Sequence, residues 1–269
     1  MNSMELPLVI FTILSQVAVG LTVISTINQW QTNEGKVAGR PGFDWVFAGI
    51  LILIAMVASL FHLGDPLGSP RTIVNLGTAW LSREILFILL FGGGIVLSYL
   101  TIAKNLGAKQ AVMAVTAIIG VLLLISSGMV YSPPGLPALN NGLPILYGLL
   151  TASILGAGFS SYFASEKQQP RLRNVLMISL VVGLILHLIM PSIWLSGGKA
   201  SQLTGSAYYS SAWFWLQIIG EFVLGLIVVG VSKKIPSWLP LVLLAGEIIG
   251  RISMFMLVVH ASSNIGGLN

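Results

Sequence analysis

Cysteine is absent from this 269-residue chain. Its absence excludes a disulfide bond, a thiolate-ligated zinc site and a cysteine-ligated iron–sulfur cluster within this chain. Histidine is also scarce, with three residues, and a bis-histidine haem would take two of them at similar depth on facing helices. We therefore expect that this chain ligates no metal and binds no cofactor covalently.

Charged residues are also scarce in this chain. Charged residues make up 8% of the chain and hydrophobic residues 55%, with a mean hydropathy of +0.93. Soluble proteins carry about 25% charged residues, so this composition predicts a multi-span membrane protein. The net charge of +5 does not point to nucleic acid, because the basic residues are scattered through short loops and form no patch.

Eight apolar runs are long enough to cross a bilayer, which takes about 20 helical residues. They lie near residues 7–27, 45–63, 84–103, 110–131, 144–163, 174–195, 212–231 and 239–260. The runs are continuous and do not alternate, which favours helices over a barrel. We predict an all-α integral membrane protein: one transmembrane domain over residues 1–269, with eight helices in two four-helix bundles. The first run lacks the basic flank and cleavage site of a signal peptide, so we expect it to remain as a span.

The distribution of positive charge predicts the orientation. Nine of the 13 lysines and arginines fall in the odd-numbered loops, three fall in the even loops and tails, and Arg251 lies inside the last run. The positive-inside rule then places the odd loops in the cytoplasm and both termini outside. Tryptophans near the ends of the runs are expected to form two interfacial belts: Trp30, Trp45 and Trp238 on the inner side, and Trp80, Trp194, Trp213 and Trp215 on the outer side.

Ionisable side chains gather in the turn between the second and third runs, at the predicted outer edge. They are His62, Asp65, Arg71, Arg83 and Glu84. Oxidising a quinol removes two electrons and two protons, which calls for an apolar slot and a proton acceptor near neutral pH. A histidine and a carboxylate at the membrane edge meet that need. The alternative is an interfacial turn whose charges pair with each other or with lipid headgroups.

Several segments of the chain resemble one protein family. They are Leu60–Pro66 (LFHLGDP), Thr78–Ile85 (TAWLSREI), Pro7–Thr12 with Gln16, and Leu244–Arg251 (LAGEIIGR). Together they resemble the membrane-anchor subunit of dimethyl sulfoxide reductase, the DmsC family. The resemblance implies a subunit of the bacterial inner (cytoplasmic) membrane that serves anaerobic respiration. It also implies menaquinol as the substrate, an iron–sulfur (ferredoxin-like) subunit as electron acceptor, and a molybdopterin catalytic subunit.

The quinol-site histidine and glutamate of that family match His62 and Glu84. In this interpretation His62 accepts a quinol proton or hydrogen bond, and Glu84 takes or relays the second proton. Asp65 and Arg83 tune the local field, and Arg71 steadies the loop or meets the partner.

A second polar group lies inside the last run. Glu247 and Arg251 are four residues apart, the spacing of an ion pair along one helix face, while Gly246 and Gly250 form a small-xxx-small step that lets helices approach closely. The pair either fixes the register of the helix or, with Glu221 of the seventh run, forms part of a proton route. A proton route would fit a related anchor of the polysulfide or nitrite reductase type. A non-redox small-solute transporter, the remaining alternative, would carry a midplane site at broken helices.

Overall fold

The computed structural model describes residues 6–31, 42–61 and 75–262, which form helices joined by turns and loops, with no strand. The helices are α1 Leu6–Gln31, α2 Phe43–Leu60, α3 Trp80–Ala103, α4 Lys109–Val130, α5 Leu143–Ser160, α6 Gln169–Leu195, α7 Lys199–Ser210, α8 Ala212–Gln217, the π-helical segment η2 Ile218–Val223, α9 Leu224–Val231 and α10 Leu239–Leu257. Eight stretches are long and apolar enough to cross a membrane, with α8, η2 and α9 together forming the seventh. The prediction of an all-α protein with eight spans is confirmed.

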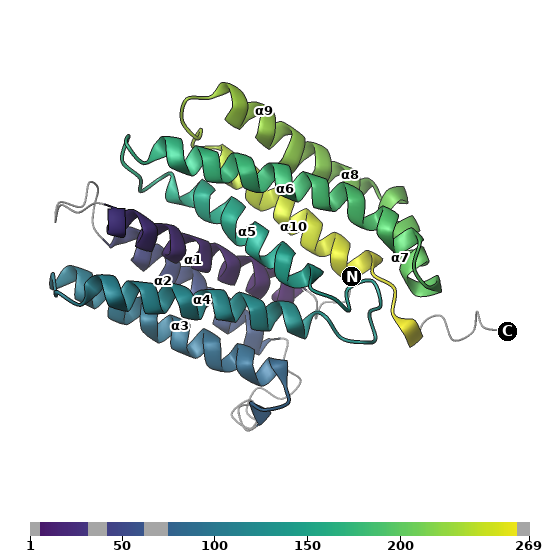
Figure 1. Ribbon diagram of the computed structural model, residues 1–269, viewed down its shortest axis with the longest axis horizontal. Coiled ribbons are helices and arrows are strands. Elements are labelled where there is room, and N and C mark those ends of the chain that lie inside the picture. The colour runs from purple at the N-terminus through teal and green to yellow at the C-terminus, as the bar shows by residue number, and fades with distance from the viewer. Residues whose placement is uncertain (1–5, 32–41, 62–74, 263–269) are drawn as a thin grey trace.

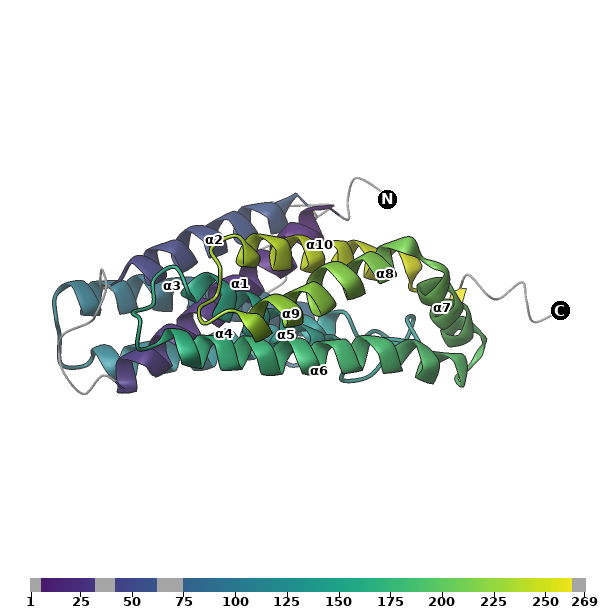
Figure 2. The same ribbon diagram turned by 90° about the horizontal axis from the view of Figure 1, so that it is seen from above.

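The spans run side by side as an elongated bundle (Figure 1). Helices α1 to α4 lie on one side, α6 and α8 to α10 lie on the other, and α1 packs against α2, α4 and α5. In the view of Figure 2, α10 and α8 lie higher on the page than α6. The beginning of α1 and the end of α10 lie at the same end of the bundle as the start of α3, which we call the Glu84 end. The division into two four-helix bundles and the orientation across the membrane remain predictions.

Glycine allows the closest helix crossing, between α1 and α5. A Cβ atom on Gly20 would lie 2.0 Å from the Ala152 carbonyl oxygen and 2.8 Å from the Gly156 Cα, so neither glycine can carry a side chain there. Small residues at such crossings let backbones approach within a bilayer, where apolar burial gives little drive for helices to associate. The crossing joins the two sides of the bundle.

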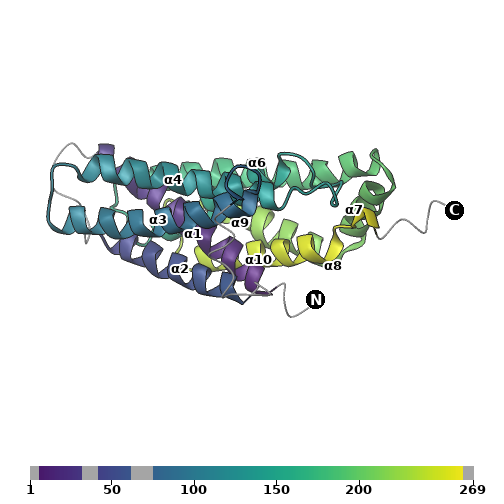
Figure 3. The same ribbon diagram turned by 90° about the horizontal axis from the view of Figure 1, so that it is seen from below.

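Two features of the fold have no signal in the hydropathy pattern. The polar stretch 196–211, predicted as a loop, contains the 12-residue helix α7, which lies at the Glu84 end of the bundle (Figure 3). Its buried face includes Thr204 and Tyr208. The span α6 begins at Gln169, five residues earlier than predicted, and Arg173 in this added part donates hydrogen bonds to the Val229 and Gly230 carbonyl oxygens at the end of α9.

The prediction of two interfacial tryptophan belts is wrong for Trp45 and Trp194. Trp45 and Trp194 are 1% and 4% exposed, so neither lies at a lipid interface of this chain. The Trp45 indole donates to Ser25 Oγ at 2.8 Å, and the Trp194 indole donates to the Ala138 carbonyl oxygen at 2.9 Å. A buried indole needs such an acceptor, which explains why these two rings turn inward.

Candidate functional site

The predicted site turn is described only in part. His62, Asp65 and Arg71 lie outside the described residues, whereas Arg83 and Glu84 lie near the beginning of α3. The Arg83 guanidinium donates from Nε to the Leu76 carbonyl oxygen at 2.8 Å and from Nη2 to that of Gly77 at 2.7 Å. It also lies 4.1 Å from the centre of the Trp80 ring, a cation–π contact. Arg83 is therefore held by the turn that precedes α3.

Glu84 faces the interior of the bundle. Its side chain is 4% exposed and lies within hydrogen-bonding reach of Ser127 on α4. Its Oε1 atom is buried and has no hydrogen-bond partner among the described residues. Arg83 makes no salt bridge with it: within the described part of the chain, Lys234 and Glu166 form the salt bridge. Arg83 and Glu84 thus do not form the mutually paired charges of an ordinary interfacial turn.

Tyr131 lies close enough to both Glu84 and Arg251 to interact with them electrostatically. It follows directly after α4, and its ring meets the edge of the Phe255 ring on α10, with 5.9 Å between centroids. Burial and the nearby Glu84 raise the pKa of the Tyr131 phenol, while Arg251 opposes the rise. The phenol therefore stays protonated and keeps a hydrogen that it can donate.

Glu247 and Arg251 do not form the ion pair that their spacing predicts. Arg251 Nη2 donates to Gln16 Oε1 on α1 at 2.9 Å, and Glu247 Oε2 accepts from the Thr151 hydroxyl on α5 at 2.8 Å. Both side chains reach past their own helix, because polar partners on other spans compensate them where lipid and water cannot. The two residues tie α10 to α1 and α5.

Glu221 joins this cluster from the π-helical turn η2. It is fully buried, accepts from Gln217 Nε2 at 3.0 Å, and lies within hydrogen-bonding reach of the Glu247 carboxyl. The glycine step on α10 makes room for it: a Cβ on Gly246 would lie 2.4 Å from Glu221 Cβ, and one on Gly250 would lie 2.2 Å from Gln217 Nε2. The close helix packing predicted from these glycines is confirmed. It serves to seat two polar side chains.

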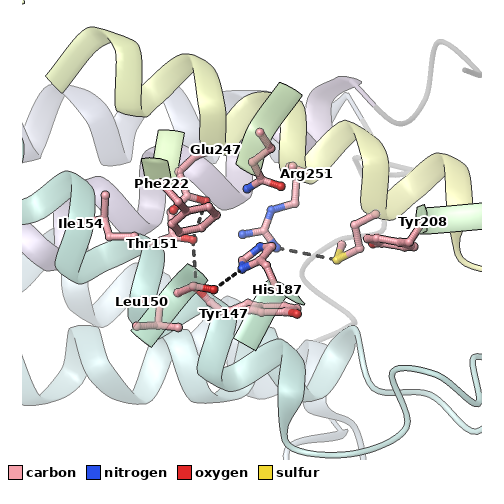
Figure 4. A pocket seen from close by; sticks show the side chains of 13 residues that line it. Tyr147, Leu150, Thr151, Ile154, His187, Tyr208, Phe222, Glu247 and Arg251 are labelled. Carbon is pink, nitrogen blue, oxygen red and sulfur yellow. Dashed lines mark hydrogen bonds between the residues drawn. The ribbon is translucent and has the colours of Figure 1, made fainter. Parts of the chain in front are cut away.

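A cavity of about 40 Å³ adjoins the cluster (Figure 4). Its polar lining comes from five elements and comprises Tyr147, Thr151, His187, Tyr208, Gln217, Glu247 and Arg251. The His187 ring lies between those of Tyr147 and Phe222, 4.7 Å from each centroid, and its Nδ1 is 2.8 Å from the Gly183 carbonyl oxygen. A carbonyl can only accept, so Nδ1 carries the hydrogen and Nε2 is left as an acceptor.

Sequence reasoning found part of this cluster. Glu221, Glu247 and Arg251 stand out as ionisable residues inside apolar runs. Gln16, Thr151 and Gln217 carry the same signal more weakly, as polar residues within such runs. No group of three or more histidine, aspartate or glutamate side chains suited to a metal occurs among residues 6–31, 42–61 and 75–262. The cluster is therefore a hydrogen-bonded polar site.

Comparison with known proteins identifies the family. Residues 1–260 match the family described as "DMSO reductase anchor subunit (DmsC)". The protein is 33% identical over 165 residues to the C subunit of the anaerobic dimethyl sulfoxide reductase of Haemophilus influenzae, a match covering 59% of this sequence and 57% of that one. It is 26% identical to the YnfH subunit of an anaerobic dimethyl sulfoxide reductase of Escherichia coli K12, with 98% of both sequences covered. With its eight apolar spans, the protein belongs to the DMSO reductase anchor subunit family and is a multi-pass membrane anchor of a DMSO reductase-type complex.

Proposed function

We propose that this anchor oxidises menaquinol at the Glu84 end of the bundle and passes the electrons to an iron–sulfur subunit, which feeds a molybdopterin catalytic subunit. The complex would lie in the inner membrane of a bacterium. Oxidation of the quinol to the quinone releases two electrons and two protons. In this proposal His62 and Glu84 receive the protons, and the electrons leave to the partner subunit.

The observation that carries the proposal is the state of Glu84. A carboxyl group that is 4% exposed, with one oxygen lacking any partner in the described part of the chain, is costly unless it serves a purpose. Glu84 lies near the beginning of α3 and follows, in the sequence, the segment that carries His62. A ring oxygen of a bound quinol would supply the missing hydrogen-bond partner of Glu84 Oε1.

The fixed geometry of Arg83 supports a role in the local field. Its guanidinium is held by two backbone carbonyls and the Trp80 ring, so its charge stays beside the site without neutralising Glu84. A nearby positive charge favours the ionised, proton-accepting form of a carboxylate. Asp65 and Arg71, outside the described residues, are proposed as further quinol-binding groups on the strength of the sequence alone.

The test compares two electron donors. We expect Glu84→Gln and His62→Ala each to lower quinol-dependent turnover of the complex at least tenfold, which is about 1.4 kcal/mol in activation free energy. Turnover with a soluble artificial donor, which bypasses this subunit, should persist. Gln keeps the shape of Glu, so packing around residue 84 is preserved.

The matched control is Glu166→Gln. Glu166 is exposed and paired with Lys234 at the opposite end of the bundle, so this variant should leave both activities unchanged. Equal loss of both activities in Glu84→Gln would indicate failed assembly, and unchanged quinol-dependent turnover would refute the site.

A further inference from the structure

Within the described part of the bundle, two buried acids, Glu221 and Glu247, lie near one buried cation. Glu221 and Glu247 are 0% and 8% exposed, and Arg251 is 7% exposed. An ionised carboxylate removed from water costs several kcal/mol unless a cation or hydrogen bonds compensate it. One guanidinium can balance one carboxylate. For the pair Glu221 and Glu247, electrical neutrality therefore favours one protonated and one ionised carboxyl group at neutral pH.

The contacts of Glu221 and Glu247 indicate where one such proton lies. Glu247 Oε2 accepts from Thr151, and Glu221 Oε2 accepts from Gln217, whereas Glu221 Oε1 is buried with no donor in the described part of the chain. The two carboxyl groups lie within hydrogen-bonding reach of each other. If both were ionised they would repel. A proton between them removes the repulsion and turns the contact into a strong hydrogen bond.

We propose that Glu221 and Glu247 are a proton-binding site, an acid pair that shares one proton at neutral pH while Arg251 balances the remaining negative charge. The shared proton exchanges with water through the adjoining cavity. This site goes beyond the proposed quinol oxidation and does not depend on it.

The cavity has the size and chemistry for water. A buried water needs about 10–15 Å³ and two to four polar partners, so about 40 Å³ admits a small cluster. The polar groups that line the cavity besides Glu247 are Tyr147 and Thr151 on α5, His187 on α6, Tyr208 on α7, Gln217 on α8 and Arg251 on α10, and Arg251 also donates to Gln16 on α1. Figure 4 shows Glu247, Arg251 and His187 around this space. A quinone ring is too large for it, so the ligands are protons and water.

The π-helical turn supplies independent support. Such turns are rare and occur mostly at functional sites, because the extra residue per turn costs helix geometry. Here the turn η2 spans Ile218–Val223 and carries Glu221 into the groove above Gly246. A purely structural helix contact would need neither the wider turn nor a carboxyl group at that position.

The test is infrared spectroscopy of the purified complex, comparing wild type with Glu221→Gln, Glu247→Gln and the control Glu166→Gln. We expect the wild type to show the C=O stretch of one protonated carboxyl group that is missing from both Glu221→Gln and Glu247→Gln, because the single acid left in either variant ionises beside Arg251. The Glu166→Gln spectrum should keep it. The band should shift in D₂O as the proton exchanges through the cavity.

The outcomes separate clearly. A band unchanged in Glu221→Gln would show that Glu221 holds no share of the proton, and a band lost in Glu221→Gln but kept in Glu247→Gln would place the proton on Glu221 without sharing. Either result overturns the proposal, as does a band that never shifts in D₂O. Since the measurement is made without quinol, the result stands apart from the turnover test of Glu84. The two isosteric Gln variants provide independent readings if one of them assembles poorly.

Discussion

Gly246→Ala is the sharpest structural test of the polar cluster, because it removes no titratable group. A Cβ atom at residue 246 would lie 2.4 Å from Glu221 Cβ and 2.8 Å from Glu221 Oε2, whereas ordinary contact begins at 3.4 Å. Relief of the first clash requires a displacement of about 1 Å between α10 and η2. The obstructing atom is the root of a fully buried side chain, so rotation of a flexible tip cannot relieve it.

The expected cost follows from overpacking. Forcing an extra methyl group into a packed interior costs about 1–3 kcal/mol, and replacing glycine by alanine within a helix returns about 0.5–1 kcal/mol. Gly220→Ala is the matched control: Gly220 precedes Glu221 in the same π-helical turn, and a Cβ there meets nothing within 4 Å. The two variants share the gain in helix propensity and differ in the clash.

Thermal unfolding of the purified complex in detergent, followed by tryptophan fluorescence, measures the difference. We expect Gly246→Ala to lower the midpoint by a few degrees relative to Gly220→Ala, and Gly220→Ala to equal or exceed the wild type. The infrared band of the shared proton should also weaken in Gly246→Ala, as Glu221 is pushed from Glu247. Equal midpoints in the two variants would refute the packing of Glu221 against Gly246.

Two further predictions concern sidedness. Because the protein has no cysteine, a single introduced cysteine reports which side of the membrane its residue faces. Ser196→Cys should react with an impermeant thiol reagent added outside, and Ser237→Cys should not. The reverse labelling pattern would show that the orientation is inverted. Quinol-dependent turnover in proteoliposomes should generate little membrane potential, because quinol protons are released on the side where the reductase consumes them; a large signal from a voltage-sensitive dye, or crosslinks from the partner to the 104–109 loop, would contradict this.

The number and position of the spans follow from one physical property. Each of the eight runs is apolar and long enough to span the hydrocarbon core of a bilayer, so length and composition suffice to identify the spans. The helix α7 escapes prediction because its buried residues, such as Thr204 and Tyr208, are polar or amphipathic and give it no apolar run. The π-helical turn could not be predicted, because the residues around Glu221 are typical of an ordinary α-helix. In the structure this turn packs against Gly246.

The candidate site is predictable to the extent that it relies on rare residues. Ionisable side chains beside or inside apolar runs are conspicuous, and Glu84, Glu221, Glu247 and Arg251 all stand out in this way. Their partners do not. The spacing along α10 predicts that Glu247 binds Arg251. Long side chains can also reach partners on any neighbouring helix, and tertiary packing determines which helices are neighbours. The glycines at residues 20 and 156 decide that packing, and their pairing has no local signature.

The distribution of polar groups along the bundle bears on whether this anchor moves protons across the membrane. Glu84 lies near the beginning of α3, Arg251 and His187 lie deeper, and Glu221 and Glu247 lie near the middle of their spans. Beyond them, several buried hydroxyl groups of the described spans are engaged by nearby partners. Thr22 and Thr101 donate to carbonyl oxygens of their own helices, and Ser98 on α3 and Thr116 on α4 bond to each other.

Hydroxyls used in this way do not form a chain of donors and acceptors along which a proton could continue. A proton-moving anchor of the polysulfide or nitrite reductase type would need titratable groups or water over the remaining half, toward the Lys104–Lys109 end. The cavity beside the acid pair is lined by Tyr208 and Met254, so we expect the pair to exchange protons with the Glu84 end. In both proposals, protons are released and taken up on one side of the membrane. For this reason we expect quinol-dependent turnover to generate little membrane potential.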